Sequence, residues 1–104
     1  MRKATVLSLL AFFAIVFSTT SASAHCASAP VQMISASWCG YCRAAIRFFR
    51  ANGVPYQEYD IDNPRTPANY RAAGKQRGVP IILVPGNEIQ MGFSEARLRR
   101  QLCL

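Results

Sequence analysis

The sequence predicts a single α/β domain whose strands and helices follow one another in the order β-α-β-α-β-β-α. Three observations support this order. A cysteine pair lies between an apolar strand and an amphipathic helix, a second strand and helix follow, and a hairpin with a last helix ends the chain. A strand, a crossover helix and a strand make a right-handed parallel pair, and the hairpin adds two antiparallel strands to it. We therefore expect a four-stranded mixed sheet with three helices.

The first 24 residues have the three parts of a secretory signal. They contain a positive start at Arg2 and Lys3, an apolar run of 12 residues over 6–17, and a small-x-small cleavage site at 22–24. The run is shorter than the roughly 20 residues that span a bilayer. We expect cleavage after Ala24, no stable membrane insertion afterwards, and a periplasmic or secreted domain over residues 25–104.

The remaining domain is small and basic. Its 80 residues carry 10 Lys and Arg against 5 Asp and Glu, a net charge of +5. A domain of this size has a thin core, and four cysteines in an exported chain indicate an oxidising compartment in which disulfides persist. The positive charge favours anionic partners. Because export separates the protein from nucleic acid, we predict no nucleic-acid partner, and we expect a monomer.

Two cysteines separated by two residues, Cys39 and Cys42, follow the first expected strand, at residues 31–36. Cys39 lies where the next helix begins, and the free N–H groups of a helix start lower the pKa of a cysteine thiol. Cys42 is one turn further on, within disulfide reach. The pair therefore predicts a redox-active disulfide. A zinc site would need two further ligands, and because Cys26 and Cys103 lack ligand spacing, we predict no metal.

The helix after the cysteine pair has a buried face and a charged face. The residues expected in the core are Cys42, Ala45, Ile46 and Phe49. The opposite side carries Arg43, Arg47 and Arg50, which form either a solvated face or a ligand-binding stripe. Asn52 and Gly53 end the helix, since Gly53 suits a left-handed backbone.

The next two elements are a strand over residues 54–61 and a second helix. Thr66 is expected to cap this helix, with Pro67 at its first position. The helix ends by Gly78, and Gly74 inside it suggests a break or an early end.

A hairpin and a last helix complete the fold. Residues 79–84 and 88–91 are strands on either side of a turn that contains Pro85 and Gly86. Ser94 is expected to cap the last helix, with Phe93 packed on Leu98 as a hydrophobic staple.

Over residues 30–102 the chain resembles the glutaredoxin family. The resemblance rests on three motifs: Cys39-Gly40-Tyr41-Cys42, Gly78-Val79-Pro80 and Gly92-Phe93-Ser94-Glu95. It implies a thioredoxin-like fold and thiol–disulfide exchange on protein or glutathione disulfides. In such exchange Cys39 attacks and Cys42 resolves the mixed disulfide. It also implies that Pro80 follows a cis peptide bond beside the sulfurs, and that the backbone of Val79 pairs with a bound thiol peptide.

Two aromatic residues accompany the cysteines. Trp38 resembles the thioredoxin pattern, and it either shields the thiolate, docks substrate or packs at the rim of the site. Tyr41, with Gly40, influences the redox potential of the pair. The alternative to an enzyme is a non-catalytic module of the same fold that binds a peptide, a metal or an iron–sulfur cluster.

The sequence does not decide whether glutathione is a co-substrate, and no resident cofactor is expected. The family generally binds glutathione with a basic residue before the first cysteine and with a paired glycine before the last helix. This chain has residues 35–37 (Ser-Ala-Ser) and 91–93 (Met-Gly-Phe) at these places. Arg71, Gln76 and Ser94 are the candidate glutathione-binding residues.

The other two cysteines, Cys26 and Cys103, stand near the ends of the expected domain. The alternating direction of the strands places both at the end of the sheet opposite the active site. We favour a structural disulfide between them, which closes a long loop and adds on the order of 4 kcal/mol to stability. Two free thiols or an intermolecular bridge are the alternatives.

Overall fold

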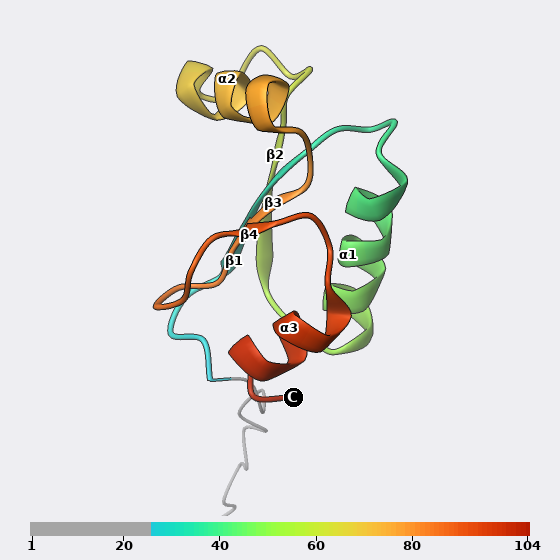
Figure 1. Cartoon of the computed structure of the whole chain (residues 1–104), viewed down its shortest axis with the longest axis vertical. Helices are drawn as coiled ribbons and strands as arrows, with labels where there is room; N and C mark the ends of the chain where they lie inside the picture. Colours follow the sequence, from blue (N-terminus) through green and yellow to red (C-terminus); the bar gives the residue numbers. More distant parts are fainter. Residues whose placement is uncertain (1–25) are drawn as a thin grey trace, which may run out of the picture.

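The computed structural model describes residues 26–104, so the predicted signal and its cleavage site lie outside the described residues. The elements are β1 (Val31–Ser35), α1 (Gly40–Ala51), β2 (Tyr56–Asp60), α2 (Ala68–Arg77), β3 (Ile81–Leu83), β4 (Gln90–Met91) and α3 (Glu95–Gln101). Their order is the predicted β-α-β-α-β-β-α, which confirms the fold class (Figure 1). In the described range, no helix has the length and apolar character needed to cross a membrane.

The four strands form one mixed sheet in the order β2-β1-β3-β4. β1 runs parallel to β2, with Val31 opposite Tyr56, and antiparallel to β3, with Met33 opposite Ile82. β3 and β4 form the antiparallel hairpin. The predicted strands are longer than the observed ones, and β4 has only 2 residues. This edge of the sheet is therefore mostly loop.

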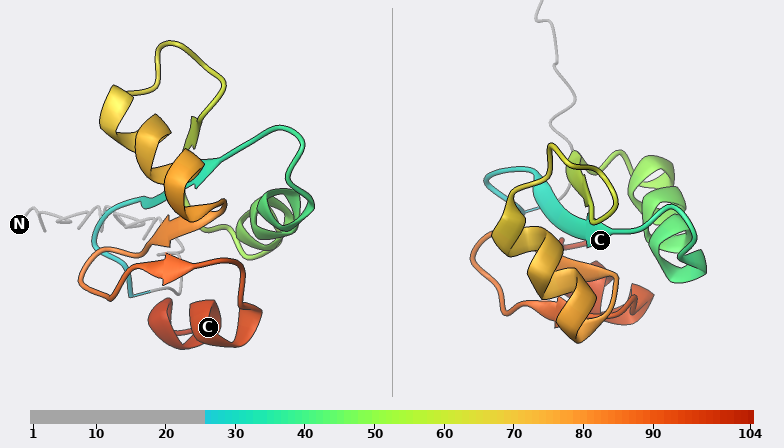
Figure 2. Two further views of the ribbon diagram at one scale, coloured as in Figure 1. Left: turned by 45° about the horizontal axis from the view of Figure 1, so that its top comes forward. Right: turned by 90° about the horizontal axis from the view of Figure 1, so that it is seen from above.

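Helices cover both faces of the sheet (Figure 2). α1 and α3 lie on one face and α2 lies on the other. Alternate residues of β1 follow this division, since Val31, Met33 and Ser35 are buried while Gln32 and Ile34 on the α2 side are half-buried. The main core lies between the sheet, α1 and α3. Its buried residues are Val31, Met33, Ala45, Phe48, Phe49, Val54, Ile82, Val84, Leu98 and Leu102.

The buried stripe of α1 differs from the prediction at two positions. Phe48 is buried, whereas Ile46 is only half-buried. The reason is the position of α3 beside α1: the ring of Phe48 packs against Phe93 at 6.1 Å between centroids. Helical periodicity predicts that a stripe is buried, but the neighbouring element decides where its edge lies.

The predicted N-cap residue of α2 was wrong. Thr66 does not cap the helix; its hydroxyl donates to the carbonyl of Asp60 at 2.7 Å. Pro67 is the N-cap residue, and its carbonyl accepts from the N–H groups of Tyr70 and Arg71. Thr66 instead ties the β2–α2 loop to the end of β2.

The break expected at Gly74 is absent, and α2 is continuous through it. Gly74 is buried where the helix meets the sheet. A Cβ atom built on it would lie 2.5 Å from Cγ2 of Ile61 and 3.0 Å from Cγ2 of Ile34. The glycine therefore allows a close approach of helix and sheet rather than a bend.

The helix ends in α1 and α3 follow the predicted chemistry. Gly53 follows the C-cap of α1 at φ 63°. The hydroxyl of Ser94 accepts from the N–H of Arg97 at 3.3 Å, and Phe93 packs on the core cluster that contains Leu98. α3 ends unusually, because Cys103 has a left-handed φ of 58° in the place where glycine is common.

We predict that Gly74→Ala destabilises the domain by about 1 to 3 kcal/mol, because the added methyl group overpacks the contact with Ile61 and Ile34. Urea unfolding followed by circular dichroism measures the change. Lys75→Ala, at the exposed neighbouring position, is the control and changes stability by less than about 0.5 kcal/mol. A more stable Gly74→Ala protein would show that helix propensity outweighs packing here.

Candidate active site

Cys39 and Cys42 form a disulfide at the start of α1, with their Cα atoms 5.2 Å apart. Cys39 is the N-cap residue of the helix and has an extended backbone, while Cys42 lies in the first turn. Cys39 is 6% exposed and Cys42 is 1% exposed. Of the two cysteines, Cys39 is the more accessible to a second molecule.

The sulfur of Cys39 accepts a hydrogen bond from the backbone N–H of Cys42 at 3.1 Å. This N–H is one of those that an α-helix leaves without an internal partner at its start. The first turn of α1 carries no acidic residue, so no carboxylate opposes a negative charge on the sulfur. When the disulfide opens, the N–H and the helix dipole favour a thiolate at Cys39.

The loop before β3 forms the opposite wall of the site. The Val79–Pro80 peptide is cis, as the resemblance implied, and Pro80 is fully buried. The sulfur of Cys39 lies 3.7 Å from the carbonyl oxygen of Val79. Among residues 26–104, no backbone group pairs with the N–H or C=O of Val79. An extended peptide that approaches Cys39 therefore meets free backbone groups.

Two exposed aromatic side chains flank the disulfide. Trp38 is 67% exposed and Tyr41 is 72% exposed, although large apolar side chains are usually covered. The indole Nε1 of Trp38 donates to a carboxylate oxygen of Asp62 at 3.2 Å. Asp62 was not predicted as a site residue, because no local signal in the sequence links it to Trp38. This hydrogen bond holds the indole toward the β2–α2 loop.

The three candidate glutathione-binding residues serve different parts of the fold. The hydroxyl of Ser94 caps α3, and the Nε of half-buried Arg71 donates to the carbonyl of Thr66 at 3.0 Å. Gln76 is exposed and lines a hollow beside α2 that neither of the others lines. The structure therefore brings together the cysteines, Val79 and Pro80, but it does not join these three residues into one site.

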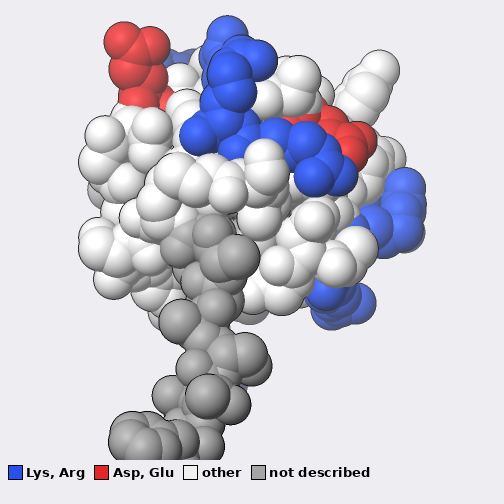
Figure 3. Space-filling view, turned by 90° about the horizontal axis from the view of Figure 1, so that it is seen from below, with Lys and Arg blue, Asp and Glu red and all other residues white. Residues whose placement is uncertain are grey.

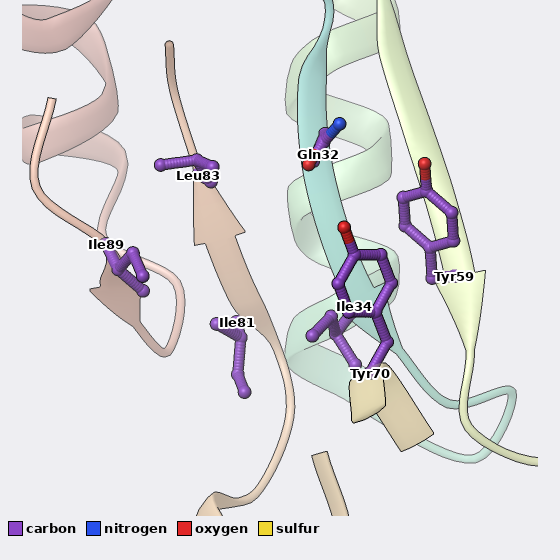
Figure 4. A pocket seen from close by; sticks show the side chains of 7 residues that line it. All are labelled: Gln32, Ile34, Tyr59, Tyr70, Ile81, Leu83 and Ile89. Carbon is purple, nitrogen blue, oxygen red and sulfur yellow. The ribbon is translucent and has the colours of Figure 1, made fainter. Parts of the chain in front are cut away.

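An apolar cavity of about 130 Å³ lies on the α2 face of the sheet (Figure 4). Its lining residues are Gln32, Ile34, Tyr59, Tyr70, Ile81, Leu83 and Ile89. None of them is a cysteine or a predicted site residue. The cavity is thus separate from the cysteine pair.

Cys26 and Cys103 form a second disulfide, with Cα atoms 5.5 Å apart and a sequence separation of 77. The backbone N–H of Cys26 also donates to the carbonyl of Leu102 at 3.1 Å. The start of the described chain and the C-terminus lie together, at the end of the molecule away from the start of α1 (Figure 1). This disulfide ties the two ends and lies far from the first one. Residues 26–104 contain no group of three or more His, Cys, Asp and Glu arranged to hold a metal.

Comparisons with known proteins agree with this geometry. A family model described as Glutaredoxin matches residues 16–89. A protein of Mycobacterium tuberculosis named "Putative glutaredoxin" is 33% identical over 57 residues, which cover 53% of this chain and 68% of that protein. The same match is found in a second strain of that organism. The crystal structure of a glutaredoxin from Archaeoglobus fulgidus superposes with a TM-score of 0.55 at 21% identity, covering 71% of this chain and 86% of that one.

We predict that the double variant Cys26→Ser/Cys103→Ser is less stable than the parent protein by about 4 kcal/mol, because the unfolded chain regains the freedom of a long loop. Urea unfolding of both proteins, with Cys39–Cys42 kept oxidised, measures the difference. The rate at which a small thiol reduces Cys39–Cys42, measured separately on both folded proteins, serves as the control and stays unchanged. A loss below about 1 kcal/mol would mean that the chain ends hold together without the bridge.

Proposed function

Because the chain belongs to the glutaredoxin family, we propose that it is a thiol–disulfide oxidoreductase that acts through Cys39 and Cys42. Members of this family are generally enzymes of this class. The observation that carries the proposal is the hydrogen bond from the N–H of Cys42 to the sulfur of Cys39. It stabilises the charged form of the sulfur, which is the nucleophile in disulfide exchange.

The proposed reaction has two exchanges. The Cys39 thiolate attacks one sulfur of a substrate disulfide, so a mixed disulfide forms and the other substrate sulfur leaves as a thiolate that takes up a proton. The Cys42 thiol then loses its proton and attacks the sulfur of Cys39. The mixed disulfide breaks, and the second substrate sulfur leaves. Two electrons pass to the substrate, which ends as two thiols, and Cys39–Cys42 ends as a disulfide.

Burial assigns the roles of the two cysteines in this proposal. Cys39 is the more exposed cysteine, and its sulfur faces the loop of Val79. Cys42 is shielded, so its role is to attack the sulfur of Cys39 in the mixed disulfide rather than a large substrate disulfide directly. The unpaired backbone groups of Val79 are suited to an extended peptide, and Trp38 and Tyr41 provide apolar surface beside it.

We propose protein disulfides as the main substrates. Glutathione is a weaker candidate, because Arg71 and Ser94 are already engaged with the protein's own backbone. The proposed location is the periplasm or the exterior, after removal of residues 1–24. A disulfide that ties the ends of a small domain suits such an oxidising compartment, and we propose that the mature domain acts as a monomer.

We predict that Cys42→Ser accumulates mixed disulfides through Cys39 when the reduced protein meets a disulfide substrate, because the resolving step is lost. Non-reducing electrophoresis and intact mass spectrometry detect the adduct. Cys39→Ser is the matched control and forms at least about tenfold less adduct, since the remaining sulfur is buried. Failure of Cys42→Ser to form any adduct would favour a binding module of the same fold.

A further inference from the structure

A groove lies between α1 and α3, on the outer side of the main core. Its volume is about 370 Å³. The apolar part of its lining consists of Ala44, Phe48, Ala51 and Phe93. Arg47 of α1 and Arg99 of α3 supply the cationic part. An apolar lining flanked by guanidinium groups suits a ligand that has both apolar and anionic groups.

The one acidic residue that lines this groove is already paired with an arginine. Glu95 also lines it, but its carboxylate accepts from Nη2 of Arg99 at 2.9 Å. The guanidinium of Arg99 lies 5.3 Å from the centroid of the Phe48 ring, so it is held by both contacts. Arg47 is exposed and forms no ion pair with any residue of the described chain. It is available to an anion from outside.

Positive charge continues along both helices. α1 carries Arg43 and Arg50 one turn on either side of Arg47, and it has no acidic residue. α3 carries Arg97 and Arg100 besides Arg99. Seen from below, the end of the domain that carries α3 and the C-terminus shows more Lys and Arg than Asp and Glu (Figure 3). The groove therefore lies within a positive field that attracts anions before contact.

The groove is connected to the active site through the β4–α3 loop. The backbone N–H of Gly92 donates to the carbonyl of Pro80 at 2.8 Å, and the next residue, Phe93, lines the groove. Along α1, Arg47 stands eight residues after Cys39, a rise of roughly 12 Å. An extended peptide covers this distance in about four residues. A peptide held at Cys39 can therefore reach the groove with a nearby side chain.

We propose that this groove binds an acidic segment of the protein substrate, about four residues from the cysteine that reacts with Cys39. The inference rests on the proposed function and adds to it a substrate class. The carboxylates pair with Arg47 and the neighbouring arginines, and an apolar side chain of the segment packs on Phe48 and Phe93. None of the exposed large apolar residues of the described chain lines the groove. Because the groove has no such side chain to insert into a bilayer, a peptide is the favoured ligand.

The test uses three disulfide-containing peptides that differ only in two residues placed four positions from the half-cystine: Asp-Asp, Ser-Ser or Lys-Lys. At low salt, we predict that kcat/KM is about tenfold higher for the acidic peptide than for the basic one. We expect Arg47→Gln to lower kcat/KM for the acidic peptide about two- to fivefold, the range of an exposed ion pair, and to leave the neutral peptide unchanged. Salt at about 0.5 M reduces the preference. Arg65→Gln removes the same charge from the β2–α2 loop and is the control.

A binding experiment separates this inference from the proposed function. A cysteine-free acidic peptide is titrated into the oxidised protein, and amide shifts at Arg47 and Phe93 are followed by NMR. Amide shifts at both residues, without thiol–disulfide exchange on any peptide, would support the proposed groove but overturn the proposed oxidoreductase activity. Equal kcat/KM on all three peptides, with no effect of Arg47→Gln, would overturn the groove proposal and support the oxidoreductase proposal. Binding to phosphatidylglycerol vesicles that depends on Arg47, without peptide shifts, would also overturn the groove proposal and assign the arginines to a membrane surface.

Discussion

The hydrogen bond from the N–H of Cys42 to the sulfur of Cys39 is the contact around which the domain is arranged. It exists because β1 ends just before the pair and α1 begins at it, so that Cys39 occupies the N-cap position. α1 is held in place by Ala45, Phe48 and Phe49, which are buried in the main core. The cis peptide before Pro80 brings the carbonyl of Val79 to the same sulfur. Each of these features positions one side of the Cys39 sulfur.

The core that supports this site is small. The described residues contain ten fully or nearly buried positions in the main cluster, and β4 contributes only 2 residues to the sheet. The Cys26–Cys103 disulfide joins the ends of this domain at the far end from Cys39. Two disulfides thus have different surroundings. One lies beside a helix start and free backbone groups, while the other ties the chain ends through Cys103, in a left-handed backbone conformation.

Much of the fold follows from local chemistry that the sequence displays. The order of elements, Gly53 at the end of α1 and Ser94 at the start of α3 are short-range features, and periodicity and capping rules predict them. Gly74 was misjudged because helix propensity does not include Ile61 and Ile34, which approach it from distant strands and loops. Phe48 was missed as a core residue for the same reason, since its burial depends on Phe93 and α3.

The site also has a part that local sequence predicts and a part that only the fold reveals. Cys39, Cys42 and the Val79–Pro80 peptide belong to motifs with a fixed spacing, so their positions could be predicted. The contact between Trp38 and Asp62 joins residues 24 apart through a loop whose path the sequence does not define. The groove likewise requires the relative position of α1 and α3. The arginines of α1 were visible as a stripe, but only the fold places Arg47 opposite Arg99.

The most direct test of the central claim is the equilibrium opening of the two disulfides across a series of glutathione and dithiothreitol buffers, with thiols assigned by alkylation and mass spectrometry. The account predicts that Cys39–Cys42 opens and closes reversibly between about −270 and −120 mV, the range of dithiol oxidoreductases, while Cys26–Cys103 stays closed until below about −300 mV. If Cys39–Cys42 opens only together with Cys26–Cys103, it is a second structural bridge, and the oxidoreductase proposal is contradicted.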